Sequence, residues 1–254
     1  GPIRAQETVI TNGAAWRWRR GTNEVSTPTT AWRTNGFNDA AWHLGNAPFH
    51  YGNSGTTGDD GITAGTILLD MRNNYRGVFL RQTFVITNVA EVQWVTFSAN
   101  YDDGYVAWIN GTEIARTNFT GSPAYTSTAT TSIEPSGNHT VSLTATQASL
   151  VVGTNVLAVQ AFNSSPSGSD FRINASLQIT KMDPFPPVVT NVTPAPGSTL
   201  TGLTQVTVSF SEPMHGVEAQ DLELNEVPAT GLIGGAGTNR FTFAFVPPPA
   251  GLAA

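Results

Sequence analysis

The chain has 254 residues, a formal net charge of −6 and no cysteine, and only 12% of its residues are charged. This composition provides no basic surface for nucleic acid or anionic lipid, and it excludes disulfides, thiolate chemistry and cysteine-bound zinc. No apolar run approaches the ~20 residues that cross a bilayer, so we expect neither a nucleic-acid partner nor membrane insertion.

Alternating apolar and polar residues predict β-strands along the whole chain, separated by short turn clusters. Threonine, serine, asparagine and glycine are abundant and lysine is nearly absent. This balance favours strands over helices and is typical of secreted bacterial β modules, so we expect an extracellular location. An all-β antiparallel sandwich is the simplest architecture for such a chain. The clearest predicted strands span residues 78–86, 92–98, 156–162, 171–179, 205–210 and 240–245.

The segment Tyr101-Asp102-Asp103-Gly104 joins two predicted strands and has two interpretations. Asp-Gly between apolar runs is typical of a hairpin turn. Alternatively, Asp102 and Asp103 supply hard oxygen ligands for Ca²⁺ at the end of a strand. The loop Gly58-Asp59-Asp60-Gly61 repeats this pattern, either as further ligands or as a solvated turn.

The strand after Gly104 is expected to place alternate side chains on opposite faces. Val106 and Trp108 then face one side, and Tyr105, Ala107 and Ile109 face the other. Asn110-Gly111 predicts a hairpin turn at the end of this strand.

Catalytic patterns are weak in this sequence. Neighbouring carboxylates in one turn point apart, which makes Asp102 and Asp103 a poor acid–base pair for glycoside hydrolysis. The histidines show no metal-ligand spacing, and there is no Gly-x-Ser-x-Gly motif. We therefore expect no enzyme activity from this chain.

Aromatic residues favour sugar recognition, in which a ring stacks on a pyranose while polar side chains satisfy the hydroxyls. Trp42, Trp94 and Trp108 lie in apolar alternation and are predicted to be buried, and Trp16 and Trp18 share one face of a strand. Aromatic residues assigned to loops, with polar residues near them in sequence, are the predicted ligand contacts: Tyr51, Tyr101, Tyr105, Tyr125, Arg76 and Asn100.

A proline-rich stretch at residues 182–187 predicts a linker, because proline removes backbone donors and stiffens the chain. We expect one domain at residues 3–181 and a second at residues 188–254.

Several pieces of the first domain resemble galactose-binding-like jelly-roll modules, found in β-galactosidase-type hydrolases and in large secreted proteins of planctomycetes and verrucomicrobia. These pieces are Trp32, FNDAAW at 37–42, GNAPFHYG at 45–52, DDGYVAWING at 102–111, GTNVLAV at 153–159 and SDF at 169–171. The resemblance covers residues 7–180 and implies a jelly-roll carbohydrate-binding module. The Asp102-Asp103 pair is also similar to the pair with which yeast adhesin lectins hold calcium.

The second domain resembles bacterial immunoglobulin-like repeats of multidomain secreted proteins. The resemblance rests on PAPGST at 194–199, VSFSEPM at 208–214 and GVEAQDL at 216–222. It implies a partial immunoglobulin-like sandwich whose final strands are missing.

Together these features predict a non-catalytic accessory module that binds polysaccharide or oligosaccharide, with Ca²⁺ as a candidate cofactor and neighbouring domains of a parent protein as partners. The alternative is a structural spacer that packs against or displays a catalytic domain and does not bind sugar.

Overall fold

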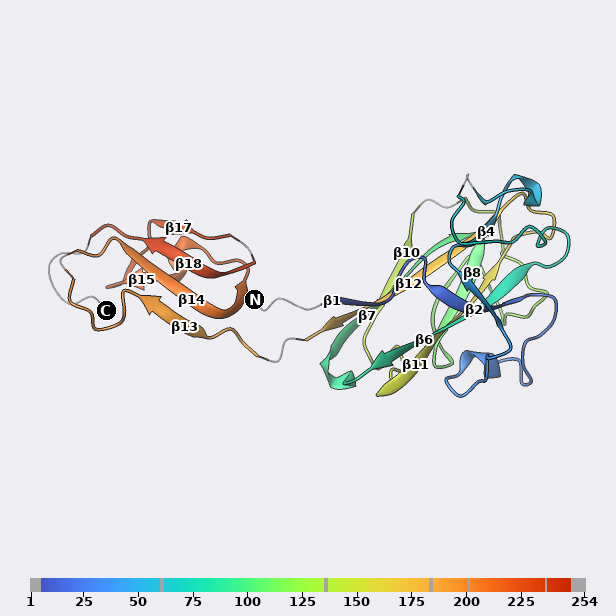
Figure 1. Ribbon diagram of the computed structural model, residues 1–254, viewed down its shortest axis with the longest axis horizontal. Coiled ribbons are helices and arrows are strands. Elements are labelled where there is room, and N and C mark those ends of the chain that lie inside the picture. The colour runs from blue at the N-terminus through green and yellow to red at the C-terminus, as the bar shows by residue number, and fades with distance from the viewer. Residues whose placement is uncertain are drawn as a thin grey trace. The chain divides into compact units, whose positions relative to one another are not determined.

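The computed structural model describes residues 6–59, 62–134, 137–182, 185–200, 202–235 and 237–247. Its strands, joined by turns and short 3-10 helices, confirm the predicted all-β class (Figure 1). The chain divides into two compact units, one spanning Gln6–Lys181 and the other containing the residues from Met182 onward. Among the described residues, no helix has the length and apolar composition needed to cross a bilayer.

The first sheet of the Gln6–Lys181 unit has the strand order β10–β7–β12–β4–β5, and β1 pairs with β12. Its pairs are antiparallel except for the parallel pair of β4 and β5. Its strands are β1 (Gln6–Ile10), β4 (Phe49–Tyr51), β5 (Thr66–Ile67), β7 (Val92–Asp102), β10 (His139–Leu143) and β12 (Phe171–Lys181).

The second sheet of this unit is antiparallel throughout, in the order β3–β2–β6–β11–β8–β9. Its strands are β2 (Ala15–Arg20), β3 (His43–Asn46), β6 (Gly77–Ile86), β8 (Gly104–Ile109), β9 (Thr112–Thr117) and β11 (Gly153–Phe162). Short 3-10 helices lie in the connections: η1 (Ala31–Arg33), η2 (Asn53–Gly55) and η4 (Val89–Glu91).

Strand β8 confirms the predicted alternation. Tyr105, Ala107 and Ile109 join the main apolar core, which contains residues of both sheets. Val106 and Trp108 join a separate cluster around Trp32. The strand is therefore buried on both faces, and the outer face of the second sheet is covered by the segment that contains η1.

The structure corrects the hairpin interpretation of Asp102–Gly104. Strand β7 before this turn belongs to the first sheet, and β8 after it belongs to the second sheet. The turn is thus a crossing between sheets, because partner choice follows the apolar faces of whole strands and not the local turn signal. The second predicted turn is confirmed, since Asn110 and Gly111 both have positive φ and connect the paired strands β8 and β9.

The tryptophan predictions hold with one exception. Trp42 and Trp108 are 6% and 3% exposed, as predicted. Trp94 is 39% exposed, so its predicted burial is wrong. It alternates with the core residue Val95, which places the indole on the outer face of the first sheet.

The second unit contains a four-stranded sheet of order β13–β14–β18–β17 and a separate two-stranded sheet, β15–β16. Residues 205–210 and 240–245 were predicted as strands, and β14 and β18 cover nearly all of them. The core contains Val208, Ala229, Phe241, Phe243 and Phe245. The elements are β13 (Val189–Thr193), β14 (Gln205–Met214), η5 (Ala219–Asp221), β15 (Glu223–Leu224), β16 (Val227–Pro228), β17 (Gly231–Ile233) and β18 (Thr238–Ala244).

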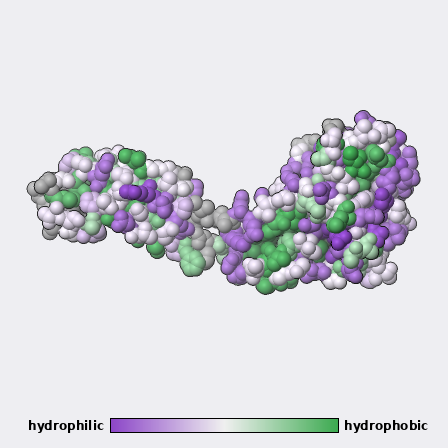
Figure 2. All heavy atoms as spheres, in the orientation of Figure 1, coloured by the Kyte–Doolittle hydropathy of each residue, from purple (hydrophilic) through white to green (hydrophobic). Residues whose placement is uncertain are grey.

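Hydrophilic and hydrophobic residues are interspersed over the face of each unit shown in Figure 2. Ligand contacts on this face are therefore expected at local features of the surface, not over one broad apolar area.

A chain cut after Lys181 is expected to keep a cooperative melting transition. The apolar clusters of the first unit lie within Ile10–Ile179, and that of the second begins at Val206. Because the cores are separate, the melting temperature of the first unit should change by less than about 2 °C, which corresponds to less than 1 kcal/mol at this size. Calorimetry tests this, and an insoluble or molten product would show that the second unit completes the first.

Candidate cation and ligand sites

Three carboxylates from distant segments meet at one end of the first unit. Asp59 lies in the loop after β4, Asp102 ends β7, and Asp170 directly precedes β12. One oxygen from each can be chosen so that all lie within 4.8 Å of one another. We call these three residues the acidic centre. Such a group of oxygen ligands is able to hold a metal ion.

Asp102 is the most unusual member of the acidic centre. It is 2% exposed, and its buried Oδ2 has no hydrogen-bond partner among the described residues. Burial, followed by the neighbouring Asp103 carboxylate, raises the pKa of Asp102 to about 9. A buried carboxylate without a partner is costly, so this side chain requires either a proton or a cation.

Asp59 is held by a histidine and an arginine. Its backbone N–H donates to Nδ1 of His50 at 3.0 Å, and the Nε2 atom of that ring lies 2.9 Å from the carbonyl oxygen of Ala64. Arg172 Nε donates to Oδ2 of Asp59 at 2.5 Å. His50 is fully buried, and burial lowers its pKa, so the ring is neutral and acts as a structural acceptor.

Asp103 was predicted as a metal ligand together with Asp102, but it lies outside the acidic centre. Its Oδ1 accepts the Ile133 N–H at 2.7 Å, and its Oδ2 accepts the Ser164 N–H at 2.6 Å. The peptide bond between Asp102 and Asp103 is cis. Asp103 therefore anchors two loops while Asp102 faces the centre. The other acidic candidate of the loop, Asp60, is outside the described residues.

Glycine suits the narrow space next to this pair. A Cβ atom on Gly104 would lie 3.1 Å from the Cβ of Ala129 and 3.1 Å from the carbonyl oxygens of Thr117 and Asn118. The Asp-Asp-Gly sequence thus serves close packing against the loop that follows β9, in addition to turning the chain.

Two predicted ligand residues, Arg76 and Tyr125, line the same surface hollow, which has a volume of about 210 Å³. Tyr125 is 36% exposed. Arg76 donates from Nη1 to the carbonyl oxygen of Thr126 at 2.7 Å, which ties the two sides of the hollow together. We call this feature the hollow, and its lining is Gly21, Thr22, Asn74, Tyr75, Arg76, Tyr125 and Thr126.

The other four predicted ligand residues have structural contacts. Tyr51 and Tyr105 are fully buried in strands, so their interpretation as exposed loop aromatics is wrong. Tyr101 also lies in a strand and packs edge-on against Tyr105 at 5.2 Å. Asn100 accepts from Arg172 and donates to the Gly137 carbonyl oxygen. Burial follows from sheet register, which the local sequence does not reveal.

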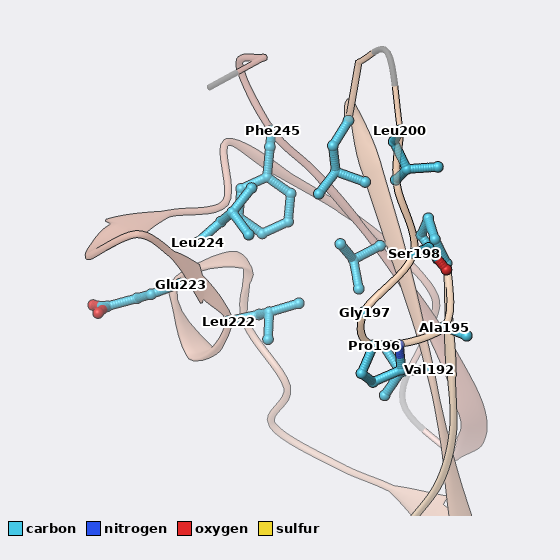
Figure 3. A pocket seen from close by; sticks show the side chains of 13 residues that line it. Val192, Ala195, Pro196, Gly197, Ser198, Leu200, Leu222, Glu223, Leu224 and Phe245 are labelled. Atoms are coloured by element: carbon cyan, nitrogen blue, oxygen red, sulfur yellow. The ribbon is translucent and has the colours of Figure 1, made fainter. Parts of the chain in front are cut away.

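The second unit has an apolar hollow of about 280 Å³ beside Val192, Leu222, Leu224 and Phe245 (Figure 3). The carboxylate of Glu223 points away from it in this view. Its lining is mainly apolar, in contrast to the hollow of the first unit, which Arg76 and Asn74 line.

Comparison with known proteins does not assign the chain to a family. No family model matches it, and no curated protein matches it. Among solved structures, a Bacteroides uniformis β-glucuronidase is 14% identical with a TM-score of 0.44, covering 81% of this chain and 22% of that protein. A Ruminococcus gnavus β-glucuronidase is 10% identical with a TM-score of 0.41, covering 96% of this chain and 39% of that protein. The chain thus spans less than half of each, and similarity at this level does not assign a function.

Sequence reasoning missed several residues of the acidic centre and its support. Asp170 and His50 lie in two pieces of the jelly-roll resemblance, SDF and GNAPFHYG, but neither piece indicated a cation site, and Arg172 lies in a predicted strand. The only local signal was the repeated Asp-Asp-Gly pattern, which pointed to Asp59. The other residues of the acidic centre and its support are brought together by the pairing of strand β12 with both β4 and β7.

Proposed function

We propose that residues 6–181 form a non-catalytic, extracellular carbohydrate-binding module that binds an oligosaccharide or polysaccharide at the hollow. The observation that carries this proposal is the convergence of an exposed tyrosine ring, Tyr125, with the guanidinium of Arg76 at one concave site. A ring face together with directional polar donors is the combination that sugar recognition needs.

The polar groups of the hollow suit hydroxyl groups. Asn74 supplies an amide whose Nδ2 donates to the Asp70 carbonyl oxygen at 2.8 Å, which leaves its Oδ1 as an acceptor. Within the described part of the chain, Arg76 uses only Nη1 in a hydrogen bond, so its other N–H groups remain donors. At about 210 Å³ the hollow is smaller than the ~300–1,000 Å³ of typical small-molecule sites, which favours a single sugar unit or a chain end.

We further propose that the acidic centre holds Ca²⁺. Carboxylate oxygens are the ligands that Ca²⁺ prefers, and the buried, unpartnered Oδ2 of Asp102 points to a missing positive charge. Asp59 and Asp102 are 1% and 2% exposed, so a polysaccharide in solution does not contact these two side chains. This burial favours a cation over acid–base chemistry on a substrate, although the raised pKa of Asp102 alone would fit either.

The alternative function is a structural spacer that displays a neighbouring domain, with the second unit as a continuation of the spacer. It gains support from Tyr51 and Tyr105, whose buried rings cannot contact a sugar. The two functions differ in one measurable property, which is glycan binding.

Tyr125→Ala is expected to weaken glycan binding by about 1–3 kcal/mol, the magnitude measured for bases stacked on aromatic rings. A glycan array with wild-type protein identifies the ligand, and retardation gels with that glycan measure the loss. Trp94→Ala is the matched control, because it removes another exposed aromatic residue, on the outer face of the first sheet. Absence of glycan binding by the wild type would favour the spacer, and equal retardation of both variants would remove Tyr125 from the sugar site.

A further inference from the structure

Two buried residues connect the acidic centre to the hollow. One connection begins in the aspartate loop, which we define as residues 163–170 and which ends in the proposed cation ligand Asp170. Asn163 Nδ2 donates to the backbone carbonyl oxygen of Asp170 at 2.9 Å. Asp103 accepts the N–H of Ser164, the next residue of the loop. The position of this loop therefore depends on Asp103 and Asn163.

The same two residues hold the tyrosine loop, which we define as residues 118–134 and which carries Tyr125. Asp103 Oδ1 accepts the N–H of Ile133 at 2.7 Å, and the carbonyl oxygen of Asn163 accepts the N–H of Ala129 at 3.0 Å. Both residues are 2% exposed, so water does not readily replace these hydrogen bonds. A shift of either residue must move both loops.

Asn163 also contacts the polar side of the hollow. Its backbone N–H donates to the carbonyl oxygen of Arg76 at 2.8 Å, and Arg76 in turn donates to Thr126 in the tyrosine loop. One buried asparagine thus touches the cation ligand Asp170, the sugar contact Arg76 and the loop that presents Tyr125.

We propose that a cation in the acidic centre positions Tyr125 and Arg76 for sugar binding through Asp103 and Asn163, without touching the sugar. This inference rests on the proposed function of the hollow. A cation in the acidic centre attracts the carboxylates of both Asp102 and Asp170, which have oxygens within 4.8 Å of each other, and so holds the aspartate loop against β7. A proton on Asp102 in place of the cation provides no such attraction. Asn163 is then a positioning residue, and glycan affinity depends on a cation at a separate site.

Hydrogen exchange measured with Ca²⁺ or with EGTA tests the coupling without a sugar. Amide hydrogens of the aspartate loop that exchange only when local unfolding releases the ion should exchange more slowly with Ca²⁺. At a hundredfold excess of Ca²⁺ over its dissociation constant, the slowing should reach up to about a hundredfold. The inference predicts slower exchange in the tyrosine loop as well, by at least several-fold. Slowing confined to the segments next to Asp59, Asp102 and Asp170 would overturn the coupling.

Asn163→Ser is expected to keep Ca²⁺-dependent slowing in the aspartate loop and to reduce it in the tyrosine loop, because it removes the side-chain bond to Asp170 while the bonds of Asp103 to both loops remain. Asn155→Ser is the matched control, since Asn155 is equally buried and hydrogen-bonded but lies at the other end of β11. It should keep the response in both loops. If Asn163→Ser does not fold, Gly168→Ala serves instead, because its Cβ would lie 2.5 Å from Oδ1 of Asn163 and displace that amide. A tyrosine-loop response as large in these variants as in the wild type would contradict the role of Asn163.

The outcomes separate this inference from the proposed function. If Ca²⁺ slows exchange in the tyrosine loop but no glycan binds on the array, the coupling stands and carbohydrate binding fails. If glycan binding is lost in Tyr125→Ala yet is the same in Ca²⁺ and EGTA, carbohydrate binding stands and the coupling fails.

Discussion

Calcium is expected to raise the free energy of unfolding by about 2.7 kcal/mol at a hundredfold excess over its dissociation constant. The proposed ion would bind the folded chain only, because Asp59, Asp102 and Asp170 come from separate segments and are apart once the chain unfolds. Melting curves with CaCl₂ and with EGTA measure the effect. Mg²⁺ at the same concentration should stabilise less, because it dehydrates reluctantly and demands octahedral geometry.

Two substitutions distinguish the proposed ligand from its neighbour. Asp102→Asn should abolish the calcium response, since the amide lacks the charge that the cation needs. Asp103→Asn should lower stability by about 1–3 kcal/mol in both solutions, because an amide N–H₂ would face a backbone N–H of Ile133 or Ser164. Its calcium response should remain. A calcium response that survives Asp102→Asn would remove this residue from the site.

The pH dependence of stability gives a second check on the calcium effect. The pKa of Asp102 is raised to about 9 in the folded chain, above its ordinary value near 4, so the folded state holds a proton that the unfolded state releases. In EGTA, stability should fall as pH rises between these values, by at most about 1.4 kcal/mol per pH unit from this group. In calcium the fall should be smaller, because the cation replaces the proton. Asp102→Asn should flatten the EGTA curve.

Arg172→Leu is expected to lower the free energy of unfolding by about 3–5 kcal/mol in EGTA, because it removes the arginine that pairs with the buried Asp59 carboxylate. The side chains of Arg172 and Asp59 are 12% and 2% exposed. In calcium the loss should be smaller, since the proposed cation lies beside the same carboxylate.

Arg20→Leu is the control for this substitution. Arg20 pairs with Asp70 at 2.6 Å, but the two side chains are 38% and 51% exposed. Water screens such a pair, so its loss should cost at most about 1 kcal/mol with or without calcium. Chemical denaturation of both variants measures the difference. Equal losses would show that the buried pair with Asp59 is not special.

The sequence was sufficient for the elements and insufficient for the sites, for different physical reasons. Alternation in 78–86 and 156–162 is a local property that predicted the strands β6 and β11, although β11 is buried on both faces. Trp94 follows the same alternation but lies on an exposed outer face. Whether a strand face is buried depends on whether another part of the chain covers it. The acidic centre depends on the register of β12 against β4 and β7, and local patterns carry no information on that register.

The hollow shows the same division. Tyr51, Tyr105 and Tyr125 are chemically alike in the sequence, and only the packing of the two sheets decides that Tyr125 alone of these presents an exposed ring. Asp102 and Asp103 are neighbours with opposite environments, since one faces two other carboxylates and the other accepts two backbone N–H groups.

A crystal structure of residues 6–181 grown with CaCl₂ and the oligosaccharide selected on the array would test both the cation site and the sugar site. We expect one ion bound by Asp59, Asp102 and Asp170, and a sugar ring stacked on Tyr125 within hydrogen-bond distance of Arg76. A sugar bound on the outer face of the first sheet at Trp94 would contradict the proposed sugar site. A crystal grown with saturating CaCl₂ and oligosaccharide that shows neither ligand at these positions would contradict both proposed sites.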